Sequence, residues 1–192
     1  MSLEQPDHEQ LTIPNDSRLH IYLNEYSKLK DEQVARIVIR EHLVYITLGV
    51  FGGVFSYALH ANQHYAFLVI PLVCVILGWM YMTVDEKVSA IGEYLRKDLT
   101  EKLAPLAGVP AEQLLGWEIA HRSDKYRRSR KWIQLFIDLL TFILSGIFAL
   151  AAFLWYQTDL NNLFLSVLVV ESFSLMLLMV WMVMTTDLKA GR

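Results

Sequence analysis

Cysteine, catalytic motifs and, over long stretches, charge are scarce in this sequence. The chain of 192 residues has one cysteine, Cys74, so it forms no internal disulfide, and we expect this thiol to be buried and inert. It has no glycine-rich phosphate loop, no paired-cysteine motif and no H-E-x-x-H or G-x-S-x-G sequence. The sequence therefore predicts a protein that is not an enzyme and that holds neither a metal ion nor another cofactor.

Charge is almost absent from four long apolar runs. Hydrophobic residues make up 54% of the chain and charged residues 19%, and the mean hydropathy is +0.33. The runs cover residues 43–60, 65–84, 133–156 and 160–184, and each is close to the length that crosses about 30 Å of hydrocarbon. Because the links within each pair are short, the runs predict an all-α polytopic membrane protein with four transmembrane helices arranged as two hairpins.

The polar segments predict long helical extensions on one side of the membrane. Residues 1–18 have the composition of a flexible tail, whereas residues 19–42 place apolar side chains at helical spacing, namely Tyr22, Tyr26, Leu29, Val34, Ile37 and Val38. The predicted division is a tail over 1–18, an amphipathic helix over 19–42, a transmembrane hairpin over 43–84, a helical and basic segment over 85–131, a second transmembrane hairpin over 132–185 and a tail over 186–192.

The distribution of positive charge predicts the orientation. Of the 17 Lys and Arg residues, five precede the first run, ten lie between the second and third runs, and two follow the fourth. The two short links contain none. Because Lys and Arg are retained on the cytoplasmic side, we expect both termini and the long middle segment to be cytoplasmic.

The densest positive charge lies immediately before the third run. This basic block consists of Arg122, Lys125, Arg127, Arg128, Arg130 and Lys131, with Tyr126 inside it. One interpretation is an anchor that touches anionic lipid headgroups. Another is a binding site for a phosphate-rich ligand such as a nucleotide or oligonucleotide, with Tyr126 as a stacking surface. The spacing favours neither, because charge this dense surrounds the whole helix.

Two acidic residues lie inside the apolar runs, Asp138 in the third and Glu171 near the middle of the fourth. An ionised carboxylate that faces lipid costs about 2.5 kcal/mol or more, so such groups usually face a bundle interior, a water-filled path or a polar partner. In an oligomer, Glu171 is a candidate for an acidic ring along a cation path. The alternative is a protonated Glu171 hydrogen-bonded to Ser172, to Ser174 or to a neighbouring helix, and an Asp138 held by the basic block.

Two glycines lie four residues apart on one face of the first run, Gly49 and Gly53. This spacing is typical of positions where another helix approaches closely. The contact is either with another copy of the chain or within the first hairpin, although glycine is also common in membrane helices in general.

Three segments carry a resemblance to known proteins. They are EYSKLKDEQVARIVIREHLVYITLG, WMYMTVDEKVSAIGEYLRKDL and GWEIAHRSDKYRRSRKWIQLFIDLLTF. From about residue 25 to residue 142, the pattern resembles a group of small bacterial integral membrane proteins with four spans and a basic cytoplasmic segment. Their design is similar to that of membrane effectors of anti-phage defence systems, including the Hailong-type effector.

The resemblance implies a specific function. It implies an oligomeric ion-channel-like effector in the bacterial inner membrane, controlled at its cytoplasmic face by a nucleotide or oligonucleotide, with a soluble nucleotidyltransferase encoded alongside. The alternative hypothesis is a non-conducting membrane scaffold or accessory subunit whose cytoplasmic helices recruit a soluble partner. A small-molecule transporter is a third hypothesis, which is weakened by the presence of only four apolar runs.

Overall fold

The computed structural model describes residues 14–114, 127–157 and 161–185. Within these ranges all regular structure is helical, and four helices are long and apolar enough to cross a membrane. The predicted all-α class and the predicted apolar spans are therefore confirmed. In chain order the elements are α1 (Asn15–His60), η1 (His64–Leu68), α2 (Val69–Tyr94), η2 (Leu95–Leu99), α3 (Thr100–Ala107), η3 (Ala111–Gln113), α5 (Arg127–Asp138), η4 (Leu139–Leu144), α6 (Ser145–Tyr156) and α7 (Asn162–Thr185).

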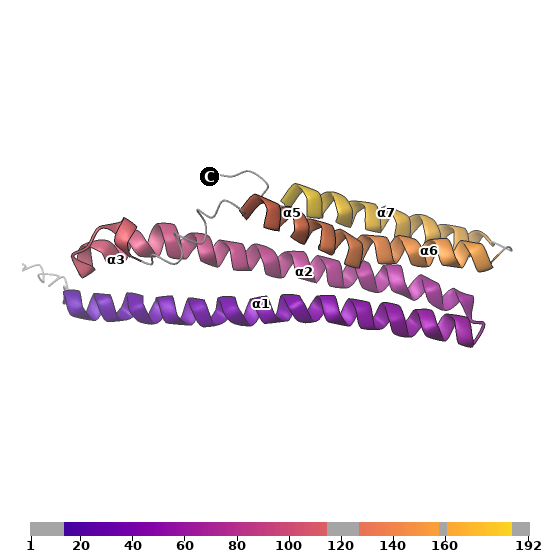
Figure 1. Ribbon diagram of the computed structural model, residues 1–192, viewed down its shortest axis with the longest axis horizontal. Helices are drawn as coiled ribbons and strands as arrows, with labels where there is room; N and C mark the ends of the chain where they lie inside the picture. The colour runs from indigo at the N-terminus through magenta and orange to yellow at the C-terminus, as the bar shows by residue number, and fades with distance from the viewer. Residues whose placement is uncertain (1–13, 115–126, 158–160, 186–192) are drawn as a thin grey trace, which may run out of the picture.

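Helix α2 lies at the centre of the bundle. It runs antiparallel to α1 along nearly its whole length, and it also contacts α6 and α7 (Figure 1). The segment from α5 to α6 and the helix α7 are shorter, so α1 and the continuation of α2 project beyond them. We call the projecting part, residues 15–42 and 86–107, the arm. The two ends of the bundle are then the arm end and, opposite to it, the link end that holds the short connections.

The core of the spans is filled with large apolar side chains. Phe67, Phe142 and Phe153 are fully buried at its centre. Two glycines bring α7 close to its neighbours, because a Cβ atom on Gly78 would lie 2.6 Å from Leu178 Cδ2 and one on Gly146 would lie 2.9 Å from Leu175 Cδ1. A larger residue at either glycine would therefore require the side chain of Leu178 or Leu175 to move.

The arm has a small core of its own. Leu95, Leu99 and Leu103 are buried against apolar residues of α1, namely Leu19, Tyr22, Tyr26 and Leu29. The Tyr94 hydroxyl donates a hydrogen bond to Glu25 Oε1 at 2.7 Å, and this bond to a carboxylate raises the pKa of Tyr94. The predicted helical continuation of the second apolar run and the first half of the predicted apolar face of α1 are confirmed. The position of this continuation outside the membrane stays a prediction.

Two predicted details of the arm are wrong. Val34 and Val38 are 59% and 44% exposed, so the apolar face of residues 19–42 does not continue along the contact with α2. Helix α1 begins at Asn15 rather than at residue 19, so the last four residues of the predicted tail are helical. Pro14 precedes this helix and Asp16 lies in its first turn, where a negative charge is favoured, which explains the earlier start.

Two wide turns of π-helix interrupt the long helices, η2 in the arm and η4 in the third span. At each one a side-chain hydroxyl bonds to a carbonyl five residues earlier. Thr100 Oγ1 donates to the Leu95 carbonyl at 2.8 Å, and Ser145 Oγ donates to the Leu140 carbonyl at 3.3 Å. At η2 the Thr100 backbone N–H also donates to the Leu95 carbonyl, so backbone and side chain of one residue bond to the same group across the wide turn.

Candidate functional site

Five polar side chains from three helices meet at the arm end of the spans. We call them the polar layer: Arg40 of α1, Tyr81 and Asp85 of α2, and Gln134 and Asp138 of α5. The layer lies where the apolar runs give way to charged sequence, so it closes the spans on that side. Buried polar groups of this kind are retained only when they find partners in the protein.

The layer is joined by short contacts across all three helices. Arg40 Nη1 lies 2.5 Å from Asp85 Oδ1, and the Arg40 guanidinium carbon lies 5.9 Å from the centre of the Tyr81 ring. Gln134 Nε2 donates to the Tyr81 hydroxyl at 3.3 Å, and that hydroxyl also interacts with Asp138. Asp138 is only 8% exposed. The third span is thus connected to α2 through Tyr81, and α2 is connected to α1 through the Arg40–Asp85 ion pair.

Helical spacing explains why these residues meet. Tyr81 and Asp85 are four residues apart in α2, and Gln134 and Asp138 are four residues apart in α5, so each pair shares one helix face. Arg40 lies on the face of α1 that contacts α2. The wide turn η4 begins directly after Asp138, which separates the part of the third span that holds the layer from the part that packs in the core.

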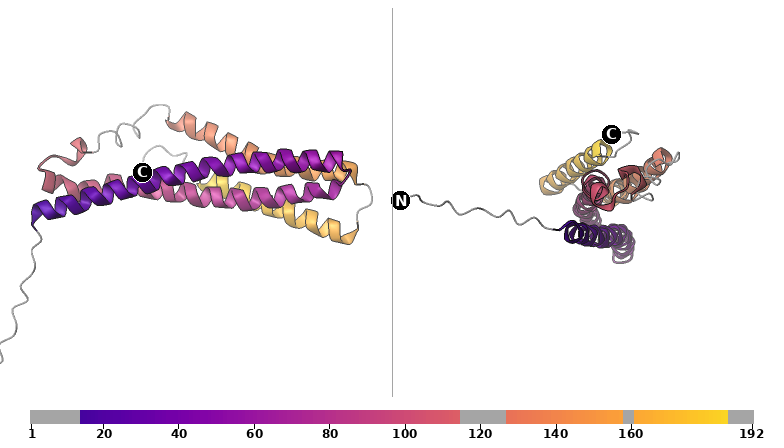
Figure 2. Two further views of the ribbon diagram at one scale, coloured as in Figure 1. Left: turned by 90° about the horizontal axis from the view of Figure 1, so that it is seen from below. Right: turned by 90° about the vertical axis from the view of Figure 1, so that its left-hand side faces the viewer.

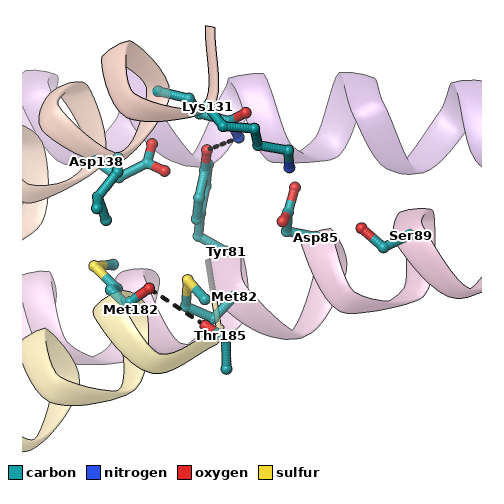
Figure 3. A pocket seen from close by; sticks show the side chains of 10 residues that line it. Tyr81, Met82, Asp85, Ser89, Lys131, Asp138, Met182 and Thr185 are labelled. Atoms are coloured by element: carbon teal, nitrogen blue, oxygen red, sulfur yellow. Dashed lines mark hydrogen bonds between the residues drawn. The ribbon is translucent and has the colours of Figure 1, made fainter. Parts of the chain in front are cut away.

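A small cavity adjoins the layer, with a volume of about 40 Å³. Tyr81, Asp85 and Asp138 line it together with Lys131, whose side chain extends toward Asp85, and Thr185 at the end of α7 (Figure 3). With polar groups on several sides, it has room for about two water molecules. Among the described residues, no group of three or more His, Cys, Asp or Glu side chains could hold a metal ion.

A larger groove of about 360 Å³ lies on the other side of the layer, between α1 and α5. Its floor is formed by Tyr81, Gln134 and Asp138, which also line the small cavity. Helices α1 and α5 diverge toward the arm end, which opens the groove (Figure 2). Asp138 is therefore buried from solvent, yet it borders an enclosed space on one side and an open one on the other.

Glu171 lies in a very different setting, in the middle of α7. It shares a helix face with the buried residues Leu168, Leu175 and Leu178, so its side chain is directed toward the bundle rather than away from it. Its Oε2 atom is buried and has no hydrogen-bond partner among the described residues. Ser174, one of the partners that the sequence offered, instead donates to the Val170 carbonyl at 2.8 Å.

The structure describes only part of the predicted basic block. Arg122, Lys125 and Tyr126 lie outside the described residues, and Arg127 and Arg128 form the first turn of α5. Arg130 is exposed and lines the groove, whereas Lys131 is half-buried and lines the small cavity. The block thus runs directly into the residues that surround Asp138.

The two predicted packing glycines are not points of close approach between the described helices. A Cβ atom on Gly49 or Gly53 would meet nothing within 4 Å. The interpretation in which they let the first hairpin pack closely is therefore wrong, since α1 contacts α2 through other residues. The interpretation in which they contact another copy of the chain stays a prediction.

Sequence reasoning missed four of the five residues of the polar layer. A signal for two of them was present, because Arg40 and Asp85 lie almost equally far from the first link: counted from Asn62, the distances are 62 − 40 = 22 and 85 − 62 = 23 residues. Two antiparallel helices joined at that link must bring these opposite charges to the same level. Nothing comparable marks Tyr81 or Gln134, which lie in apolar surroundings in the sequence.

No family model, curated protein or solved structure matches the chain. The geometry of the site is therefore the basis on which its function must be argued.

Proposed function

We propose that the chain is one subunit of an oligomeric, ion-conducting assembly in a membrane, and that its conduction is controlled from the arm end. The observation that carries the proposal is the carboxylate of Glu171, which is directed inward at mid-span with an oxygen that has no partner among the described residues. An ionisable group at this depth is costly, and such groups usually mark ion or proton paths.

The path would lie between copies of the chain. The interior of a single bundle is filled by Phe67, Phe142 and Phe153, so it offers no continuous polar route. In contrast, α7 is packed along one side only, and Glu171 is only partly buried, so a neighbouring subunit would be able to reach its carboxylate. A ring of such carboxylates around an axis of symmetry would favour cations.

The control would act through the third span. The basic block continues into α5, and the polar layer connects α5 to α1 and α2. The wide turn η4 follows at once, and π-helical turns of this kind often lie at functional sites. A phosphate-rich ligand, such as a nucleotide or oligonucleotide bound to the block, would then shift α5 relative to α6.

The orientation and setting belong to the same proposal. All Lys and Arg residues lie outside the apolar runs and outside the two short links, so the arm and both termini would be cytoplasmic. The proposed setting is a bacterial inner membrane, with a role in anti-phage defence and with a soluble nucleotidyltransferase that would supply the ligand.

Ion flux from liposomes tests the proposal. The purified protein should release a trapped cation, and Glu171→Gln should lower the rate at least about tenfold while the oligomer remains intact. Ser172→Ala, one residue along the same helix and exposed, is the matched control and should conduct normally. Absence of flux with and without oligonucleotides, or equal rates for the two variants, would remove the proposal.

A second candidate function is favoured by the surface of the arm. Val34, Val38 and Ile39 are all exposed on the part of α1 that precedes the first apolar run. If the arm lies in water, these side chains form an apolar surface suited to a soluble partner, as in a non-conducting scaffold. Copurification of a stable monomer with one soluble protein, lost in Val34→Asp, would support this function, whereas conduction by the isolated protein would contradict it.

A further inference from the structure

The groove between α1 and α5 has features that the proposed function does not use. Its two sides are formed by Arg40, Glu41 and Val44 of α1 and by Arg130, Ile133 and Ile137 of α5. The space of about 360 Å³ between them is open to the outside of the bundle. We ask which molecule has the chemistry to occupy it.

The groove lies at the level of lipid headgroups. Arg40 is three residues before the first apolar run, which starts at Leu43, and Arg130 is three residues before the third run, which starts at Ile133. At 1.5 Å per residue, each arginine is therefore about 5 Å outside the hydrocarbon. Arginines at the ends of spans meet the phosphates of the bilayer at this depth.

The polar side of the groove fits a phosphodiester. Arginine presents five N–H donors and binds phosphate through two of them at once. Arg40 uses Nη1 for Asp85, which holds the guanidinium in place and leaves further donors for a second anion. Arg130 stands on the opposite wall, so a phosphate between the two helices would be held from both sides.

The other walls fit an acyl chain. Below the arginines, in the direction of the hydrocarbon, lie Val44, Ile133 and Ile137. Ile133 and Ile137 are 57% and 46% exposed in the single chain. An open space beside apolar side chains inside a bilayer is filled by lipid, because an empty one forfeits dispersion contacts along its whole lining.

The acidic residues of the groove select among phospholipids. Glu41 is exposed at the rim, and Asp138 lies on the floor, so the two arginines are balanced by two carboxylates. A headgroup that carries no cation, such as glycerol, would place its phosphate near Glu41 with nothing to offset the charge of that carboxylate. A headgroup that carries a primary ammonium beside its phosphate would instead donate hydrogen bonds to that carboxylate.

We propose that this groove binds one glycerophospholipid of the leaflet on the arm side, with its phosphodiester between Arg40 and Arg130, an acyl chain along Val44, Ile133 and Ile137, and an ethanolamine ammonium at Glu41. The bound lipid completes the contact between α1 and α5, which the protein alone leaves open. The site shares Arg130 with the basic block, but lipid retention is measured without conduction, so it stands or falls separately from the proposed function.

Native mass spectrometry of the detergent-solubilised protein tests the site. The probes are phosphatidylethanolamine, phosphatidylcholine and phosphatidylglycerol with identical acyl chains, added as an equimolar mixture. We expect one phosphatidylethanolamine to be retained per chain, at least about fivefold in preference to the other two lipids. Arg130→Gln should weaken retention about tenfold, and Glu41→Gln should abolish the preference for ethanolamine.

Matched variants separate the site from general effects. Arg36→Gln removes a cation one turn from Arg40 and outside the groove, and it should bind lipid normally. Ile137→Trp fills the groove without changing charge and should lower retention, whereas Val169→Trp on the exposed side of α7 should not. Equal retention in Arg130→Gln and Arg36→Gln, or retention of phosphatidylglycerol as strong as that of phosphatidylethanolamine, would overturn the proposal.

Discussion

The two acidic residues inside the apolar runs lie in opposite environments. Asp138 belongs to the polar layer, where Tyr81 and Arg40 lie close to it, and Lys131 adds positive charge. Glu171 has an oxygen with no hydrogen-bond partner in the described part of the chain. The same chemical group therefore has two different effects on the fold. The carboxylate of Asp138 joins helices together, whereas the carboxylate of Glu171 destabilises the folded chain because its buried oxygen makes no hydrogen bond within the described residues.

The presence or absence of hydrogen-bond partners at a buried carboxylate indicates where function is to be sought in a helical membrane protein. A buried carboxylate that forms hydrogen bonds within its own chain has a structural role that accounts for its presence. A carboxylate without a partner needs a reason outside the single chain, such as another subunit or a permeating ion. The following substitutions test this contrast. Each is measured as the free energy of unfolding in mixed micelles unless another measurement is named.

The largest loss is expected from Arg40→Met. This change leaves Asp85 and Asp138 without their nearest cation in a partly buried layer, which should cost about 3 kcal/mol. Arg36→Met is the control, because Arg36 pairs with the exposed Glu32 and its loss should cost less than about 0.5 kcal/mol. Similar losses for the two arginines would mean that the layer does not stabilise the bundle.

Asp138→Leu should have a smaller effect of the same sign. It removes an acceptor from Tyr81 and leaves the tyrosine hydroxyl and Gln134 with fewer partners in a buried site, at a cost of about 2 kcal/mol. The additional change Tyr81→Phe should then cost little more, because the interaction has already been lost. If the losses of unfolding free energy in the double variant were additive, Asp138 and Tyr81 would not interact.

Glu171→Leu should change stability in the opposite direction. It replaces a buried oxygen that lacks a partner by an apolar group of similar size, which should add about 1 kcal/mol. Ser172→Leu, on the exposed side of α7, should be close to neutral and is the control. If Glu171→Leu destabilised the protein as much as Asp138→Leu, the contrast between the two acids would disappear.

The smallest effect is expected in the arm, where Glu25 is a third carboxylate, outside the spans. Tyr94→Phe removes the 2.7 Å bond to Glu25 and should weaken the protection of nearby amides in hydrogen exchange by about 0.5–1 kcal/mol. Because this bond raises the pKa of Tyr94, its contribution is complete below pH about 10 and is lost as the pH rises through the raised pKa. An unchanged alkaline profile in the Tyr94→Phe variant would contradict this account.

The sequence predicted the elements well because hydrophobicity over some twenty residues is a strong, local signal. The four apolar spans, the extension of the second span and the face of α1 with Tyr22, Tyr26 and Leu29 all followed from it. Val34 and Val38 continue the same spacing in the sequence but are exposed. At this level Gln33 and Arg40 of α1 contact α2 instead, so a different face of α1 is turned toward α2. Spacing within one helix does not determine which face that is.

The candidate site was only half predictable from the sequence. Asp138 and Glu171 stood out as charges in apolar runs, but their partners depend on contacts between helices. Arg40 and Asp85 could have been paired by their distances from the first link, whereas Tyr81 and Gln134 could not. The glycines also show that spacing in the sequence does not identify contacts between helices. Gly49 and Gly53 have the expected spacing, but the close contacts are at Gly78 and Gly146.

The wide turn η4 also determines what a deletion or an insertion in the third span would do to the structure. An α-helix turns by about 100° with each residue, and a π-helical turn holds one residue more than an α-helical turn. Deleting one residue from η4 would return the third span to a regular α-helix and would rotate everything before it relative to α6. Asp138 would then swing away from Tyr81, and Arg130 away from the groove. The six residues of η4 thus determine how α5 is rotated about its own axis relative to α6. This rotation decides which side chains of α5 face α1 and α2.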